Sequence, residues 1–430
     1  MNYSLQGYVR DEFGIGEDII KIADAAEKEI EGVFKGINSI REFNQYKVIK
    51  AMQDHHLSDT HFSGTTGYGY DDRGREVLDA VYASVFKAED ALVRHQIVAG
   101  TQAIAVCMYG NLRPGQVLLS ITGKPYDTLE EVIGIRGEGS GSLKDFGIGY
   151  RQVELLPDGN IDLAGVRDAI APDTGMVLIQ RSRGYTMRPA LKIREIKRAV
   201  EFVKEINKEI IVLVDNCYGE FVEEQEPVEA GADLAAGSLI KNPGGGLAPT
   251  GGYIAGKSRF VRNAAYRLTT PGLGRKVGAT LGNNRLLIQG LFLAPHAVAE
   301  SLRGAAFCAA VMKRLGYETS PLPDEARGDI IQAISFKNPD SMIAFCQGIQ
   351  KGSPVDAFVT PEPWDMPGYD SPVIMAAGAF IQGSSIELSA DAPLKPPYTA
   401  YMQGGLVYEH VKLGVMTAIK YMKERQLIRF

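Results

Sequence analysis

Asp215 and Lys241 are the two residues whose types and spacing most clearly suggest chemistry. The carboxylate follows the short apolar run 211–214, which has the character of a fully buried parallel strand, so we expect Asp215 at that strand's carboxyl end. Ligands of open α/β sheets bind at this edge. The lysine lies 26 residues further on, at the end of segment 237–241 and just before the glycine-rich run 244–252.

A lysine beside glycines, downstream of a carboxylate at a strand end, suits a pyridoxal phosphate (PLP) site. PLP withdraws electrons only while its pyridine nitrogen is protonated, and a buried carboxylate, here Asp215, keeps it so. Lys241 would form the Schiff base with the cofactor aldehyde, for which we expect an amine of lowered pKa. The Ser238 hydroxyl is placed to bind the phosphate. An arbitrary Asp and Lys are more often a helix cap and a solvated surface residue, so the wider sequence must support the assignment.

The order of short motifs in this region resembles PLP enzymes of fold type I in cysteine and methionine metabolism: cystathionine γ-synthase, cystathionine β-lyase and methionine γ-lyase. Those enzymes carry a D-N-T-F element, then G-A-D and an apolar residue, then H-S-x-T-K. This chain has Asp-Asn-Cys-Tyr at 215–218, Gly-Ala-Asp-Leu at 231–234 and Gly-Ser-Leu-Ile-Lys at 237–241. The likeness extends over most of the chain and is most specific to the methionine-γ-lyase-like branch called aluminium-resistance proteins or carbon–sulfur lyases. It implies that Cys217 and Ser238 bind the cofactor.

The resemblance assigns two further parts of a cofactor site. Gly100, Thr101 and Gln102 match the family's phosphate-binding loop, and a Gly-Thr pair that opens an apolar helix offers backbone N–H groups and a positive dipole end to an anion. Tyr126 matches a tyrosine that stacks on the pyridine ring and assists proton transfer. We therefore expect these residues around the same cofactor as Asp215 and Lys241.

The resemblance also implies that two subunits share each active site. In the family a Tyr-x-Arg segment reaches across the dimer interface to the neighbour's cofactor phosphate, which the fork of an arginine binds well. Tyr70 and Arg73, in the glycine-rich stretch 63–75, are the counterparts, although two residues rather than one separate them. We therefore expect a homodimer or homotetramer.

The chain departs from the family pattern where the substrate should bind. An arginine of an R-L-S element clamps the substrate α-carboxylate in the family, whereas the matching segment 385–389 carries Glu387. A glutamate would repel a carboxylate, so either another cation takes this role or the substrate differs. The candidate cations are Arg181, Arg183 and Lys395, of which the two arginines follow a predicted strand end. The family asparagine that bonds the phenolic oxygen of PLP at that strand end is also replaced.

The composition is that of a globular enzyme and excludes several other classes of protein. The 430 residues are 45% hydrophobic and 23% charged, which is ordinary for a soluble chain of two or three domains. The formal net charge of −6 and the absence of a basic block argue against nucleic-acid binding. The four cysteines form no C-x-x-C pair, which is typical of reduced thiols. No signal peptide or membrane-spanning run is apparent, so we expect a cytoplasmic protein without a membrane partner.

Two other kinds of site are less well supported. Acidic and histidine residues crowd together at positions 54–61, but their spacing matches no common metal-ligand pattern, and no metal is expected. The glycine run 244–252 lacks the strand–turn–helix setting of a nicotinamide-binding site.

The pattern of elements predicts how the site is positioned. Short buried strands alternate with amphipathic helices through the middle of the chain, which is typical of an α/β fold with a mostly parallel sheet, here that of the fold-type-I PLP enzymes. We expect three parts: an N-terminal helical segment at 1–60, a large PLP-binding domain at 61–293 and a smaller C-terminal α/β domain at 294–430.

Together these features predict a PLP-dependent carbon–sulfur lyase. It would act by β- or γ-elimination on a sulfur-containing amino acid of the cystathionine, methionine or cysteine class, with Lys241 removing the α-proton, Tyr126 assisting and Asp215 holding the ring nitrogen protonated. One alternative is another fold-type-I PLP reaction, such as aldol cleavage or transamination. The other is a PLP-binding regulatory or stress protein without turnover, for which Glu387 is the argument.

Overall fold

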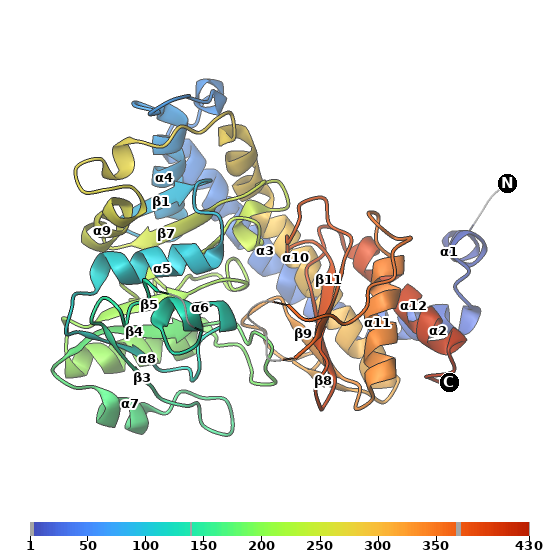
Figure 1. The fold of residues 1–430 in the computed structure, drawn as a ribbon. Helices are drawn as coiled ribbons and strands as arrows, with labels where there is room; N and C mark the ends of the chain where they lie inside the picture. The colour runs from blue at the N-terminus through green and yellow to red at the C-terminus, as the bar shows by residue number, and fades with distance from the viewer. Residues whose placement is uncertain (1–3, 138–139, 367–370, 430) are drawn as a thin grey trace. The chain divides into compact units, whose positions relative to one another are not determined.

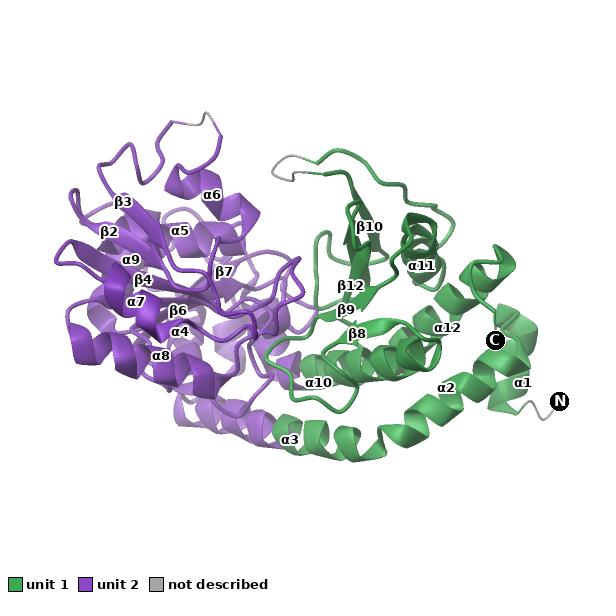
Figure 2. Ribbon diagram, turned by 90° about the horizontal axis from the view of Figure 1, so that it is seen from below, with its two compact units in different colours: residues 1–41, 296–430 green, residues 42–295 purple. Residues whose placement is uncertain are grey.

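The computed structural model describes residues 4–137, 140–366 and 371–429. The chain divides into two compact units, which Figure 2 shows in different colours. The large unit is Glu42–Pro295, and the small unit combines Met1–Arg41 with His296–Phe430. Each unit is described by itself below.

The large unit is built on a seven-stranded sheet of order β1-β7-β6-β5-β4-β2-β3. The strands from β6 to β3 in that order are mutually parallel, while β7 runs antiparallel to both β6 and β1. This confirms the predicted α/β fold with a mostly parallel sheet. The strands are β1 (Asp90–Arg94), β2 (Val117–Ser120), β3 (Gly149–Gln152), β4 (Thr174–Gln180), β5 (Ile211–Asp215), β6 (Leu234–Ser238) and β7 (Gly252–Gly256).

Helices cover both faces of this sheet, as Figure 1 shows. Alternate residues of β5 point to opposite faces, so Leu213 packs with α5 and α9 while Val212 and Val214 pack with α8. Helix α8 buries a regular stripe that includes Ile196 and Val200. The helices of the unit are α4 (Arg73–Val85), α5 (Gly100–Asn111), α6 (Asp127–Ile133), α7 (Leu163–Ala169), α8 (Ile193–Ile206) and α9 (Ser258–Leu268), with short 3-10 helices at Asp59–Phe62, Asn242–Gly244 and Gly274–Lys276.

The small unit contains a five-stranded antiparallel sheet of order β10-β11-β12-β9-β8. Its strands are β8 (Glu318–Ser320), β9 (Gln332–Ser335), β10 (Val373–Ala377), β11 (Ser389–Pro393) and β12 (Thr399–Gln403). Its helices are α1 (Leu5–Phe13), α2 (Glu17–Glu29), α11 (Pro339–Lys351) and α12 (Tyr408–Glu424), and two long helices, α3 (Glu31–Asp54) and α10 (Asn284–Arg314), run from one unit into the other. Among the described residues, none of the helices combines the length and the apolarity needed to cross a bilayer.

The two compact units differ from the three parts that we predicted from the sequence. The apolar stripe of α2, which includes Ile19, Ala23 and Ala26, joins the same core cluster as residues of α11 and α12. Lys412 of α12 also bonds Glu27 at 2.7 Å. The first helices therefore belong with the C-terminal residues instead of forming a separate segment of 60 residues, because their apolar faces are buried there.

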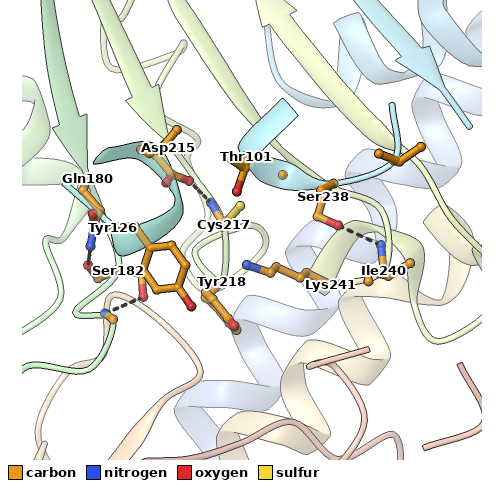
Figure 3. Close-up of a pocket in the computed structure, with 15 residues that line it drawn as sticks. Thr101, Tyr126, Gln180, Ser182, Asp215, Cys217, Tyr218, Ser238, Ile240 and Lys241 are labelled. Carbon is orange, nitrogen blue, oxygen red and sulfur yellow. Dashed lines mark hydrogen bonds between the residues drawn. The ribbon is translucent and has the colours of Figure 1, made fainter. Parts of the chain in front are cut away.

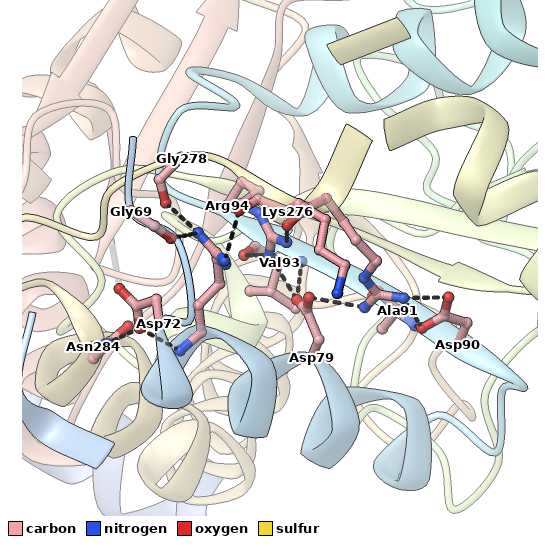
Figure 4. Close-up of polar contacts among 12 residues, drawn as sticks. Gly69, Asp72, Asp79, Asp90, Ala91, Val93, Arg94, Lys276, Gly278 and Asn284 are labelled. Carbon is pink, nitrogen blue, oxygen red and sulfur yellow. Dashed lines mark hydrogen bonds and ion pairs between the residues drawn. The ribbon is translucent and has the colours of Figure 1, made fainter. Parts of the chain in front are cut away.

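A network of ion pairs, drawn in Figure 4, fixes α4 against the edge of the large sheet. Asp79 of α4 contacts Arg94 of β1 at 2.8 Å and Arg275 at 2.9 Å, and Arg275 also pairs with Asp90. Asp72 caps α4 by accepting a 2.9 Å hydrogen bond from the Arg75 backbone N–H. The start of α4, which carries Arg73, is therefore held firmly.

We expect Asp72→Ala to lower the free energy of unfolding by about 2–4 kcal/mol at pH 7, because it removes a helix cap and leaves buried donors without an acceptor. The Asp72 carboxylate is 1% exposed and also accepts from the Thr65 and Thr280 hydroxyls and from the Asn284 side chain. Denaturant unfolding followed by circular dichroism measures the loss. The exposed Glu76 of the same helix supplies the control Glu76→Ala, and equal stability of the two variants would contradict the prediction.

The same carboxylate gives the stability a defined pH dependence. Burial works to raise the pKa of Asp72, but hydrogen bonds from Thr280, Thr65, Arg75 and Asn284 outweigh it and leave the pKa below its usual value. The stabilisation is therefore complete above the pKa of an unfolded aspartate, about 3.9, and is lost as the pH falls through the lower pKa of the folded state.

Candidate functional site

The carboxyl ends of the three central parallel strands open on one cavity. Strand β4 ends at Gln180, β5 at Asp215 and β6 at Ser238, and the register pairs Gln180 with Asp215. A cavity of about 200 Å³ lies at these ends, and Figure 3 shows its lining. Its lining residues, all of the large unit, are Val98, Ala99, Gly100, Thr101, Tyr126, Leu129, Gln180, Ser182, Gly184, Asp215, Cys217, Tyr218, Ser238, Ile240 and Lys241.

Asp215 presents a buried carboxyl to this cavity. The residue is 9% exposed, and its Oδ1 accepts a 3.1 Å hydrogen bond from the Cys217 backbone N–H, which fixes its orientation. Burial raises the pKa of Asp215, while the charge of Lys241 opposes the shift. A carboxyl in this setting binds a proton or a cationic N–H group readily.

Lys241 enters the same cavity from the segment after β6, and its Nζ lies 3.9 Å from the centroid of the Tyr218 ring. Burial works to lower the pKa of Lys241, but the electrostatic contributions of its neighbours outweigh it and leave the pKa above the ordinary value; these neighbours are Cys217, Tyr218, Asp215 and Glu220. This corrects the expectation of a lowered pKa. The sequence did not indicate that Glu220, besides Asp215, would act to raise the pKa of this amine.

The first turn of α5 forms the anion-binding side of the cavity. Gly100 begins the helix, and no side chain caps it at Ala99. A Cβ atom on Gly100 would lie 3.0 Å from Cys217 Sγ and 3.4 Å from Ser238 Cβ, so the helix can approach the two strand ends this closely only with glycine. Backbone N–H groups and the positive end of the helix dipole are thereby presented beside Thr101.

Most of the predicted cofactor residues line this cavity. Tyr126 stands just before α6, with its ring centroid 6.4 Å from that of Tyr185, and Ser238 Oγ accepts a 3.3 Å hydrogen bond from the Ile240 backbone N–H. Gln102 is not among the lining residues. Its side chain turns back and accepts a 2.7 Å hydrogen bond from the Val98 backbone N–H, so it supports the loop that precedes the helix.

The predicted substrate-binding cations are not brought to the cavity. Arg181 is fully buried, and its guanidinium donates to Asn216 and Glu223 at 2.8 Å each and lies 3.7 Å from Glu226. It is therefore a structural cation, which corrects its assignment to the substrate carboxylate. Arg183 is also fully buried and does not line the cavity. Lys395 is exposed in the small unit, between β11 and β12, and its role stays a prediction.

Tyr70 and Arg73 lie outside the cavity of their own chain. Tyr70 is 57% exposed and stacks on Tyr68 with ring centroids 5.6 Å apart. Arg73, the first residue of α4, is also exposed. These positions leave both side chains accessible to another subunit, although their part in a shared site remains a prediction.

Gln180 and Tyr218 are among the lining residues that were not singled out from the sequence. Gln180 occupies the strand end where the resembled enzymes have asparagine, and its side-chain Oε1 is buried without a hydrogen-bond partner among the described residues. Tyr218 has a backbone φ of 72°, an unusual conformation for a tyrosine, and this turn places its ring under Lys241. The signal that the sequence offered for Gln180 was a polar residue at the end of a predicted buried strand.

The histidine-rich stretch before α4 is engaged in local contacts. His61 Nδ1 accepts a 3.0 Å hydrogen bond from the Ser58 backbone N–H, and His55 Nε2 lies 2.7 Å from the Ser84 hydroxyl. Within the part of the chain that the structure describes, no group of three or more His, Cys, Asp or Glu residues is arranged to hold a metal ion.

The fold defines the class of protein. The α/β architecture of the large unit, with its seven-stranded and mostly parallel sheet, matches that of fold-type-I PLP enzymes. At 17% and 14% sequence identity, the PLP-dependent protein YhfS of Escherichia coli and metB of Corynebacterium glutamicum share this fold, with TM-scores of 0.60 and 0.55.

Within that class, the methionine gamma-lyase family matches residues 19–423, and the chain belongs to this family of PLP-dependent enzymes. The uncharacterised protein YnbB of Bacillus subtilis is 55% identical over 96% of this chain and 98% of its own length. The structure of a carbon–sulfur lyase involved in aluminium resistance from Clostridium novyi is 50% identical, covers 98% of this chain and 100% of its own, and has a TM-score of 0.94. A protein of Listeria monocytogenes, provisionally assigned as a cystathionine β-lyase involved in aluminium resistance, is 55% identical over 93% of this chain and 99% of its own, with a TM-score of 0.92.

Proposed function

We propose that this chain binds PLP through Lys241 and cleaves a carbon–sulfur bond in a sulfur-containing amino acid by β- or γ-elimination. The observation that carries the proposal is that Asp215, Lys241 and the uncapped first turn of α5 line a single cavity. An enzyme of this kind needs a proton-holding carboxyl, an amine and an anion site, and here the three lie together.

The residues present fit PLP. The first turn of α5, with Gly100, Thr101 and Ser238 around it, would hold the phosphate, and Asp215 would face the ring nitrogen. Lys241 would bond the aldehyde carbon, while Gln180, with its unpartnered amide oxygen, lines the same wall. When bound, PLP supplies an electron-withdrawing ring that makes the α-proton of an amino acid acidic.

Residues of the chain would then accept the α-proton and keep the ring nitrogen protonated. Lys241 Nζ, when it is not bonded to the cofactor, is the base in the cavity that would accept the α-proton, and the Tyr126 hydroxyl is placed to assist at the same site. Asp215 would keep a proton on the ring nitrogen facing it, because its buried carboxyl favours such a partner. Burial raises the pKa of the Cys217 thiol, so that thiol stays neutral.

The assignment of sulfur as the leaving atom is supported by the relatives, two of which are described as a carbon–sulfur lyase and a cystathionine β-lyase. Glu387 stands where the family has its carboxylate-binding arginine, and its side chain has a structural role. Its carboxylate accepts hydrogen bonds of 2.8 and 2.9 Å from the Phe380 and Ile381 backbone N–H groups within the small unit. The arginine's role must therefore pass to another residue.

The proposal is tested by incubating the purified, PLP-loaded protein with cystathionine, methionine and cysteine. We expect release of a thiol (hydrogen sulfide when the substrate is cysteine), ammonia and a keto acid in equal amounts from at least one of them. Keto acid without released sulfur would indicate transamination, and an aldehyde product would indicate aldol cleavage. Cofactor attachment without any product would favour the regulatory alternative, and each of these results would overturn the lyase proposal.

The proposal includes an active site shared between subunits, since Tyr70 and Arg73 are exposed on their own chain. We expect Arg73→Ala to weaken PLP binding about tenfold or more, because it removes a charge-assisted hydrogen bond to the phosphate. We further expect Arg73→Ala co-expressed with Lys241→Ala to recover activity when both are assayed at a PLP concentration too low to load the Arg73→Ala parent. In an equal mixture half of the dimers pair the two variants and hold one intact site of two, so about a quarter of the wild-type activity should return. A co-expressed pair as inactive as its parents would contradict a shared site.

A further inference from the structure

The aromatic ring of Tyr218 lies directly against the amine of Lys241. The lysine Nζ is 3.9 Å from the ring centroid and over the face of the ring, and both side chains line the cavity, as Figure 3 shows. A cation over the face of a tyrosine is attracted by the negative charge of the π-system, and the attraction is stronger where water is excluded. The mechanism above assigns no role to this ring.

A tight turn after β5 puts the ring in this place. Tyr218 has a backbone φ of 72°, in the left-handed region that a residue with a Cβ adopts only at a cost. The Gly219 N–H donates a 2.9 Å hydrogen bond to the Asn216 carbonyl, which closes the turn. A Cβ on Gly219 would lie 2.5 Å from the Arg181 side chain, so the turn packs this closely because that position is glycine. The surroundings therefore impose the unusual conformation of the tyrosine.

A hydrogen bond also ties the lysine segment to the same turn. Asn242, the residue after Lys241, is fully buried, and its side-chain amide donates at 2.9 Å to the backbone carbonyl of Glu220, two residues after Tyr218. The distance between the ring and the amine is thus set by two backbone segments that are bonded to each other, besides the two side chains themselves.

An uncharged ring suits an amine that must both hold a proton and form a covalent bond, because it attracts the ammonium less strongly than a carboxylate ion would and so lets the amine leave. Burial works to lower the pKa of Lys241, and the groups that act to raise it are Cys217, Tyr218, Asp215 and Glu220. Burial keeps the Cys217 thiol neutral and raises the pKa of Glu220 to about 8, so that carboxyl is mostly protonated at neutral pH. Asp215 faces the ring nitrogen of the cofactor in the proposed function.

We propose that the face of the Tyr218 ring positions the free amine of Lys241 and stabilises it once it has accepted the α-proton. The inference deepens and rests on the proposed function, in which this amine alternates between bonding the cofactor and accepting a proton. The α-carbon gives its proton to Nζ and keeps the electron pair of the broken C–H bond. The ring attracts the resulting ammonium without exchanging a proton, so Tyr218 is a positioning residue whose hydroxyl is not needed for this role.

The test measures the lysine in cofactor-free, full-length protein, so it does not depend on lyase activity. Trace acetylation with acetic anhydride at several pH values between 8 and 10 labels neutral amines, and mass spectrometry compares Lys241 with the exposed Lys197 of the same chain. We expect Tyr218→Leu, which removes the π-system, to raise the relative labelling of Lys241 about tenfold, since each unit of lost pKa multiplies the neutral fraction by ten. Tyr218→Phe keeps the ring and should label within about twofold of wild type.

Two further variants separate the ring from the space that it fills. Leu129 also lines the cavity, so Leu129→Ala widens the way to the lysine and keeps the ring, and it should leave the labelling ratio unchanged. Tyr218→Met keeps much of the side-chain volume without a ring, should label like Tyr218→Leu, and carries the test if Tyr218→Leu does not fold. In the PLP-loaded enzyme, loss of the ring should lower kcat severalfold at an unchanged KM, and Tyr218→Phe should restore it.

Three results of the labelling experiment would overturn the inference. They are a wild-type ratio in the folded variants that lack the ring, an equal rise in Tyr218→Phe, and a rise in Leu129→Ala as large as that in Tyr218→Leu. The second would assign the effect to the hydroxyl, and the third to access of the reagent. Failure of the wild-type protein to bond PLP would instead overturn the proposed function and leave the labelling result readable.

Discussion

Replacing Lys241 by alanine should abolish lyase turnover, with a fall in kcat of about 10⁴-fold, because the variant loses both the covalent anchor and the base. In the cavity, Lys241 is the amine that meets Asp215, Tyr126 and the first turn of α5. No other lysine lines that cavity in the described part of the chain, so no neighbouring amine can replace it. Steady-state assays of thiol release from the best substrate measure the effect.

The matched control is Lys197→Ala on the exposed surface of α8. It removes the same side chain outside the cavity and should leave kcat unchanged. The Lys241→Ala protein should still bind PLP without a covalent bond, because the phosphate site at α5 and the Asp215 carboxyl remain. If Lys241→Ala retained more than about a tenth of the wild-type kcat, the lysine would not be the base, since a positioned base contributes at least about 10²-fold.

Asp215→Asn is expected to have the second largest effect, a fall in kcat of about 10³-fold, which corresponds to about 4 kcal/mol of transition-state stabilisation. An asparagine of the same shape can bond the ring nitrogen but cannot hold a proton on it, so the ring withdraws electrons less well. The carboxyl is 9% exposed, and burial gives it a raised pKa, so solvent does not take over its role.

Asp215→Asn should keep its covalent link to the cofactor, because Lys241 is intact. Borohydride reduction followed by mass spectrometry checks this point separately from the kinetics. The control Asp173→Asn changes a partly exposed carboxylate that pairs with Arg151 at 2.7 Å and should not alter kcat. If Asp215→Asn kept the wild-type kcat, Asp215 would not be the residue that holds the proton on the ring nitrogen of PLP.

Local sequence was sufficient to predict the parts of the site that depend on strand ends and on a helix start. The apolar run 211–214 fixed Asp215 at a strand tip, and the Gly-Thr pair fixed the beginning of α5, because both signals lie within a few residues of the functional group. The resemblance to the family then indicated which strand ends would share one cavity.

The features that could not be predicted depend on contacts between residues that lie far apart in the sequence. Arg181 follows a strand end, as a substrate-binding residue would. Its guanidinium instead bonds Glu223, which lies 42 residues further along the chain, and it does not line the cavity. The packing of α2 with α12 joins residues 385 apart, as in the pair Glu27 and Lys412.

We propose above all that the amine of Lys241 bonds PLP in the cavity that Asp215 also lines. Borohydride reduction of the PLP-loaded wild-type protein, followed by proteolysis and tandem mass spectrometry, tests it most directly. We expect a phosphopyridoxyl group on the peptide that contains Lys241 and on no other peptide. An unmodified Lys241 peptide, or the group on a different lysine, would contradict it.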